Sequence, residues 1–108
     1  MKNIAFAVML VCSPALASHA ADAKSTWADL CAKCHGAEGK GDTKMGKKLQ
    51  LKDYTDATVQ AGFTDEQAFK ALKEGIKDKA GNTRMKAVEG LSDDDIHGMV
   101  AYVRSLKK

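Results

Sequence analysis

Two thiols and an imidazole lie within five consecutive residues, Cys31–His35, which read Cys-Ala-Lys-Cys-His. On a helix, residues three apart share a face with Cβ atoms about 5–6 Å from each other, so Cys31 and Cys34 can reach one planar ligand. This spacing is typical of covalent haem attachment. Each thiol can add to a porphyrin vinyl group, while His35 presents a ring nitrogen to the iron. The motif therefore predicts one covalent haem c held by Cys31 and Cys34, with His35 as the proximal ligand.

Three other roles for the motif fit less well. A structural zinc site needs four ligands, and beyond the motif the chain that follows a cleaved leader adds only the distant His97. A thioredoxin-like redox pair belongs in a strand–helix setting, and no strand-like apolar run precedes Cys31. A simple disulfide between Cys31 and Cys34 would leave His35 without a role.

The first twenty residues have the order of a secretory signal peptide. A lysine precedes a short apolar stretch, and small residues that suit cleavage follow it. The apolar run, Ile4–Val11, is shorter than the ~20 residues that a membrane span needs. We expect cleavage after Ala20, with Ala17 and Ala23 as alternative sites, and a periplasmic location without a transmembrane segment. Two free thiols would tend to pair in such an oxidising compartment, and thioether bonds would give them another fate.

Removal of residues 1–20 would leave one domain, residues 21–108, with a formal charge of +2 because only one lysine is lost. Two haem propionates would bring this charge close to zero, so the balance does not indicate a nucleic-acid partner. Basic residues do gather locally, with five lysines in 33–48 and six basic residues in 70–86. These segments flank the expected haem ligands and could dock acidic redox proteins, or they could be ordinary solvated surface.

Helical patterns account for most of the domain. One helix is expected from near Ser25 into the motif, with Trp27, Leu30, Cys31 and Cys34 on its buried face. Thr64 and Ser92 each precede an acidic or amide residue three positions on, which predicts capping boxes at the starts of two more helices. The third helix has an apolar stripe of Ile96, Met99, Val100, Val103 and Leu106. No segment demands a sheet. So small a core suggests that folding depends on the cofactor.

The second axial ligand must come from far along the chain, or be absent. His97 lies opposite the third helix's apolar stripe and should face solvent, whereas Met99 belongs to the stripe and is most simply core. Met45 is only ten residues from His35, a short path around a haem edge. Met85 lies fifty residues away in the irregular stretch between the second and third helices. Met85 is therefore the expected distal ligand, with simple packing under the loop as the alternative.

Several segments together resemble the small monohaem c-type cytochromes that carry the haem motif near the N-terminus and the methionine near the C-terminus. The matching parts span nearly the whole domain; they are Cys31–His35, Gly36–Gly41, Gly46–Leu49, Met85, and Leu91–Ile96 leading to Ala101–Arg104.

The resemblance implies an all-α fold with three main helices around the haem and with the N- and C-terminal helices packed crosswise. It implies a monomeric electron carrier, not an enzyme, that shuttles single electrons between redox complexes. Cys31 and Cys34 match the haem attachments, His35 the proximal ligand and Met85 the distal ligand. A His/Met pair raises the reduction potential and closes the coordination sphere. A five-coordinate peroxidase or gas sensor, or a haem subunit of a larger oxidoreductase, remains the alternative.

Two positions depart from this family. Relatives often have proline after the glycine that matches Gly46, where a backbone carbonyl orients the proximal histidine, and here Lys47 stands instead. We expect the Lys47 carbonyl to accept the His35 N–H, as second-shell partners do. Relatives also often follow the distal methionine with proline, whereas Lys86 follows Met85.

Overall fold

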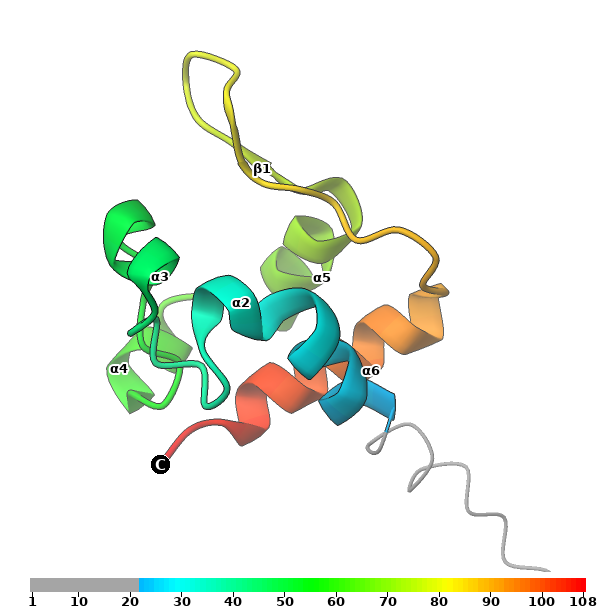
Figure 1. The fold of residues 1–108 in the computed structure, drawn as a ribbon. Helices are drawn as coiled ribbons and strands as arrows, with labels where there is room; N and C mark the ends of the chain where they lie inside the picture. The colour runs from blue at the N-terminus through cyan, green and yellow to red at the C-terminus, as the bar shows by residue number, and fades with distance from the viewer. Residues whose placement is uncertain (1–21) are drawn as a thin grey trace, which may run out of the picture.

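A computed structural model describes residues 22–108, so the expected signal peptide lies outside the described residues. Residues 22–26 are helical and continue without a break into a π-helical turn and the haem motif (Figure 1). The elements that follow along the chain are η1 (Trp27–Cys31), α2 (Ala32–His35), α3 (Lys44–Leu49), α4 (Ala57–Ala61), α5 (Asp65–Glu74), β1 (Ile76–Lys77), β2 (Thr83–Met85) and α6 (Asp93–Ser105). The all-α prediction is confirmed. None of the helices described is long and apolar enough to cross a bilayer.

Both predicted capping boxes are present. The Thr64 hydroxyl accepts from the Gln67 amide at 3.1 Å, and the Gln67 side chain accepts from the Thr64 amide at 2.8 Å. The same reciprocal pair joins Ser92 and Asp95 at the start of α6. Each box satisfies two amides that a helix end would otherwise leave unpaired, which is why α5 and α6 begin where the sequence predicts.

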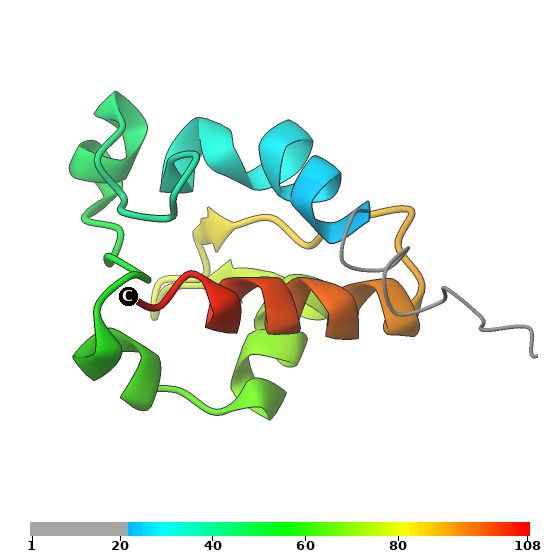
Figure 2. The ribbon, with the colours of Figure 1, turned by 90° about the horizontal axis from the view of Figure 1, so that it is seen from below.

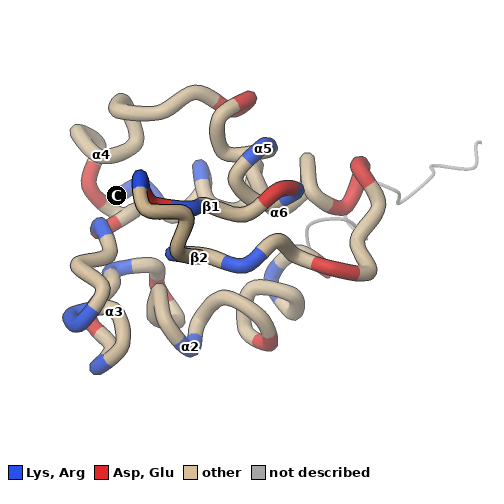
Figure 3. The backbone as a smooth tube through the Cα atoms, turned by 90° about the horizontal axis from the view of Figure 1, so that it is seen from above, with Lys and Arg blue, Asp and Glu red and all other residues tan. Residues whose placement is uncertain are grey.

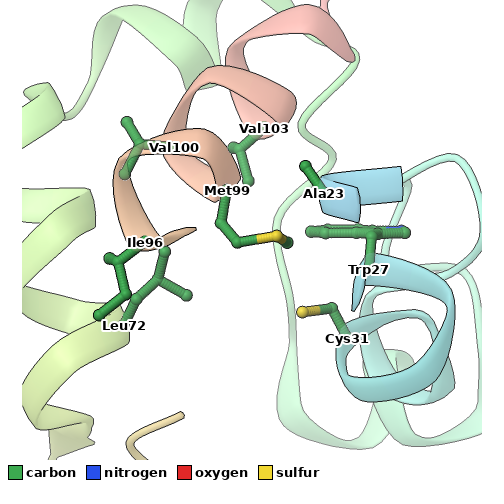
Figure 4. Close-up of a cluster of buried hydrophobic side chains, with 8 residues drawn as sticks. All are labelled: Ala23, Trp27, Cys31, Leu72, Ile96, Met99, Val100 and Val103. Carbon is green, nitrogen blue, oxygen red and sulfur yellow. The ribbon is translucent and has the colours of Figure 1, made fainter. Parts of the chain in front are cut away.

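The core lies between the N-terminal helical segment and α6, which cross each other in Figure 1. The rings of Trp27 and Tyr102 meet there, with centroids 5.6 Å apart. Figure 4 shows Cys31 and Trp27 facing Met99 across this space. The buried apolar side chains are Ala23, Trp27, Cys31, Leu72, Ile96, Met99, Val100 and Val103. The predicted stripe of α6 is therefore confirmed, with Leu106 half-buried at its end.

Leu30 does not join this core, contrary to expectation, and its side chain is 55% exposed. The reason is the π-helical turn: the Ala32 amide bonds to the Trp27 carbonyl, five residues back. A turn that is one residue wider moves Leu30 away from the face that Trp27 occupies. The expectation of a regular 3.6-residue stripe through the motif was wrong at this residue.

A short antiparallel hairpin also departs from the expectation that the stretch after α5 is irregular. β1 and β2 pair with Ile76 opposite Met85 and Lys77 opposite Thr83, with a register irregularity between the two pairs. Figure 1 shows the hairpin projecting on one side of the molecule, beyond α2 and α6. In the view of Figure 2 it lies at a height between these two helical stretches. Met85 is the last residue of β2 and is opposite Ile76.

Candidate functional site

A cavity of about 630 Å³ lies between the motif and the hairpin. Cys31 and His35 line it from η1 and α2, and Met85 lines it from β2. Apolar walls come from Phe63 and Leu72, among others. The fold thus brings three of the four predicted site residues to one space, although Met85 is fifty residues from His35. Cys34, the fourth, is half-buried one turn after Cys31 and is not part of the lining.

The imidazole of His35 lies between two aromatic rings. Its centroid is 5.6 Å from that of Trp27 and 5.5 Å from that of Tyr54. Burial lowers the pKa of His35, because a desolvated imidazolium is disfavoured. A neutral imidazole is the form that binds metal, so this environment suits a ligand to iron.

The Nδ1 atom of His35 is buried and has no hydrogen-bond partner. The expected bond from His35 to the Lys47 carbonyl is therefore not made. The Lys47 carbonyl instead accepts from the Gln50 amide, at 3.3 Å, within the end of α3. A carbonyl oxygen can accept two hydrogen bonds, so this bond alone does not exclude one from His35.

Backbone contacts position the motif against α3. The Thr43 hydroxyl donates to the Cys34 carbonyl and also accepts from the Gly46 amide at 2.8 Å, as the N-cap of α3. A Cβ on Gly46 would clash with the Gly41 carbonyl and lie 2.7 Å from the Cys34 carbonyl. Only glycine allows the backbone of α3 to approach the motif this closely.

The environment of Cys31 is unlike that of a catalytic thiol. No disulfide joins Cys31 to Cys34, and burial, followed by the proximity of Cys34, raises the pKa of Cys31 to about 11. A reactive thiol of a Cys-x-x-Cys motif instead has a lowered pKa, so this finding disfavours the thioredoxin-like interpretation. Residues 22–108 contain no group of three or more histidine, cysteine or carboxylate side chains that could hold a metal ion.

The other candidates for the second axial ligand lie elsewhere. Met45 is 41% exposed on α3, and Met99 is buried in the core with 2% exposure. His97 is exposed, as expected, and stacks on Phe69 with centroids 4.5 Å apart. None of the three lines the cavity, whereas Met85 does.

A second cavity of about 630 Å³ shares Ile76, Lys77 and Met85 with the first. The hairpin is therefore a wall common to both cavities. Exposed Leu30 lines this second cavity, which explains where the π-helical turn sends that side chain. Figure 3 shows lysine and arginine residues on α2, on α3 and along the hairpin.

The cavity with Cys31 and His35 fits a haem in size and chemistry. Its volume is in the range of about 300–1,000 Å³ that cofactor pockets occupy. The walls are mostly apolar, while the imidazole and the thioether sulfur supply the polar and polarisable groups. These are the ligand types of electron-transfer haem proteins.

Tyr54, Phe63 and Gly75 also line this cavity, and of these three sequence reasoning did not assign Phe63 and Gly75 to it. Tyr54 and Phe63 contact each other edge to face, with centroids 5.9 Å apart. They lie in a loop region without a strong periodic pattern, so only their aromatic character could have indicated them.

Comparisons with known proteins agree with this geometry. The family model "Cytochrome c" matches residues 20–107. A curated relative, cytochrome c-554(547) of Halothiobacillus neapolitanus, is 28% identical over 91 residues, which cover 84% of this chain and all of the relative. A solved structure, the KustC0563 c-type cytochrome, superposes with a TM-score of 0.67 at 28% identity, covering 80% of this chain and 98% of that one. The chain therefore belongs to the cytochrome c family, whose members bind haem c covalently and carry electrons.

Proposed function

We propose that this protein is a periplasmic carrier of single electrons with one haem c. In this proposal Cys31 and Cys34 form the two thioether bonds, and His35 and Met85 are the two axial ligands. The observation that carries it is that His35 and Met85 line one haem-sized cavity from different elements.

Haem c, when bound, supplies a one-electron couple, and the chain's own residues determine what else can happen there. His35 enters as a neutral imidazole because burial disfavours its charged form. Met85 supplies a thioether, which raises the potential and leaves no position for a substrate. Closed coordination favours electron transfer over turnover of peroxide or binding of a gas.

Redox proteins are the expected partners. Lys77 lines both cavities, and Lys52 and Lys70 line the one that holds His35. Cations around the cofactor's opening would steer the carrier to acidic partners. An ordinary solvated surface is the competing interpretation, and its rates would depend little on local charge.

The first experiment tests the cofactor and its number. Protein exported with its leader should give one haem per chain in a pyridine haemochrome assay, and acidified acetone should not extract the haem. A colourless protein with two free thiols would contradict the proposal. Extractable haem would contradict the assignment of Cys31 and Cys34. An obligate complex on native purification would indicate a subunit of a larger enzyme.

The second experiment tests the ligand. The ferrous protein should not bind carbon monoxide, whereas the Met85→Ala variant should bind it readily. Met45→Ala is the matched control, because Met45 is an exposed methionine that lies outside both cavities. Rapid binding by the unaltered protein would favour a five-coordinate peroxidase or sensor.

A further inference from the structure

Gly75 lies where α5 ends, and the backbone that carries Met85 passes directly over it. Its φ angle is +79°, a region that favours glycine. A Cβ on Gly75 would lie 2.7 Å from the Met85 carbonyl oxygen and 2.8 Å from the Ala87 amide nitrogen. Ordinary van der Waals contact begins near 3.4 Å, so these main-chain atoms would have to move by several tenths of an ångström. Unlike the tip of a flexible side chain, they can move only with their strand.

Backbone pairing holds the strand to β1 on one side of this crossing and to α5 on the other. Before it, Ile76 pairs with Met85 in the hairpin. After it, the Val88 amide donates to the Leu72 carbonyl at 2.9 Å. Leu72 is itself buried in the core. The strand that crosses Gly75 is therefore anchored to the core through Leu72.

The side chain of Met85 packs at the edge of the core and has open space beside it. It is partly buried against the core cluster, and it lines the second cavity as well as the first. The neighbouring Arg84 is exposed and reaches α3 through one hydrogen bond, from its guanidinium to the Leu49 carbonyl at 3.1 Å. The Met85–Ala87 backbone crosses Gly75 too closely to leave room for a Cβ, so this crossing limits how far the strand can lie from α5.

We infer that Gly75 is a positioning residue for Met85: the absence of a side chain at Gly75 sets how far the thioether reaches into the cavity that His35 lines. This inference rests on the proposed role of Met85 as distal ligand. A methyl group at Gly75 lifts the strand away from α5 and withdraws the sulfur from the iron.

Gly90 provides a matched control. Its φ is +78°, almost that of Gly75, but a Cβ there would have no atom within 4 Å. Alanine at either position therefore takes a positive φ that residues with a side chain rarely adopt, and only Gly75→Ala adds the clash with the Met85 strand.

The test uses purified, haem-loaded protein in the ferric state. Gly75→Ala should lose most of the charge-transfer absorption of sulfur-ligated haem and should have a lower reduction potential. If sulfur then stays bound in a minority of molecules, the apparent affinity for added imidazole rises about tenfold or more. Gly90→Ala should keep the absorption, the potential and the affinity. Equal effects of both substitutions, or no effect of Gly75→Ala, would overturn the inference.

Met85→Ala separates this inference from the proposed function. If Met85→Ala leaves the absorption intact, the ligand assignment itself is wrong. If Met85→Ala removes the absorption and Gly75→Ala does not, only the positioning role fails. In the Met85→Ala background, Gly75→Ala should change imidazole affinity by less than about twofold, because its route of action has gone. A larger change in imidazole affinity would show that Gly75→Ala loosens the site as a whole and does not act through Met85.

A measurement on the unaltered protein covers the case in which Gly75→Ala does not mature. The close crossing should give a nuclear Overhauser effect between the Gly75 α-protons and the Ala87 amide proton in the haem-loaded protein. Its presence supports the crossing in the functional state, and its absence contradicts the positioning role.

Discussion

The indole Nε1 of Trp27 donates a hydrogen bond to the carbonyl of Gly36, at 3.0 Å. Both residues are buried, and Gly36 directly follows His35. The bond therefore ties the end of α2 to the start of the π-helical turn, across the whole haem motif. One side chain thus holds the motif closed while its ring packs against His35 and Tyr102.

Trp27→Phe should test this tie. Phenylalanine keeps an aromatic ring but removes the indole donor. The Gly36 carbonyl still accepts from the Gly39 amide at 3.1 Å, so losing the one bond should cost about 0.5–1.5 kcal/mol of unfolding free energy. Urea unfolding of the haem-loaded protein would measure the loss. Tyr102→Phe is the control, because the Tyr102 ring also contacts Trp27. Tyr102 is half-buried, and the loss of its hydroxyl should cost less than about 0.5 kcal/mol. Equal losses would show that the indole bond contributes little.

Gln60→Leu should destabilise the fold more than its size suggests. The buried Gln60 amide donates to the Tyr54 carbonyl at 2.7 Å and to the Val103 carbonyl at 2.8 Å, joining the loop that presents Tyr54 to α6. Leucine has a similar volume but removes the donor to the Tyr54 carbonyl and one of two donors to the Val103 carbonyl, which also accepts from the Leu106 amide at 3.2 Å. We therefore expect a loss of about 1–3 kcal/mol by thermal or urea unfolding.

The control uses the exposed side of the same network. The Arg104 guanidinium binds the Gln60 side chain at 3.0 Å and the Asp65 carboxylate at 2.7 Å. Asp65 is 72% exposed, so Asp65→Asn should cost less than about 1 kcal/mol. A loss from Asp65→Asn as large as that from Gln60→Leu would contradict the burial argument.

Local signals predicted the long helices well. Thr64 with Gln67 and Ser92 with Asp95 are short-range patterns, and each formed the capping box that its spacing requires. The failures depended on longer-range geometry. The π-helical turn shifts Leu30 out of the regular stripe although the apolar spacing predicts it there, and the hairpin has strands too short to show an alternating pattern.

The residues of the candidate site also divide into those that the local sequence predicted and those that only the folded structure reveals. Cys31 and His35 were predicted from adjacent residues, and the structure places both at the cavity. Gly75 was identifiable as a helix end but not as a contact of Met85, because that crossing joins segments ten residues apart through a bulged hairpin. The sequence likewise did not predict that His35 Nδ1 is buried without a partner.

Lys77→Glu should slow reduction by an acidic partner protein. Lys77 is exposed and lines both cavities, so reversing its charge changes the field at the proposed docking site. We expect bimolecular rates to fall about two- to fivefold at low ionic strength, with a weaker dependence on salt. Stopped-flow mixing across a salt series would measure both quantities.

Lys107→Glu controls for net charge in that experiment. Lys107 is exposed near the C-terminus and lines neither cavity. It makes the same change in total charge, so its effect should be clearly smaller. Identical salt slopes for the two variants would favour an ordinary solvated surface over a docking site.

Tyr54 should ionise above the usual range for tyrosine. Burial raises the pKa of Tyr54, with the neighbouring Cys31 as a lesser cause. The second cause disappears once Cys31 is a thioether, whereas burial beside His35 remains. A raised pKa means that the folded state holds the phenol proton more tightly than the unfolded state. The stabilisation is therefore complete below about pH 10 and is lost as the pH rises from there through the folded-state pKa.

Phenolate absorbance would follow this ionisation during an alkaline titration of the haem-loaded protein. The chain has two tyrosines, and the late step should vanish in Tyr54→Phe. Unfolding experiments should show the same sign: the native protein should lose stability more steeply than Tyr54→Phe above about pH 10. Ionisation of Tyr54 at the ordinary tyrosine pKa would mean that water reaches the ring, and that the wall of the cavity beside His35 is open in solution.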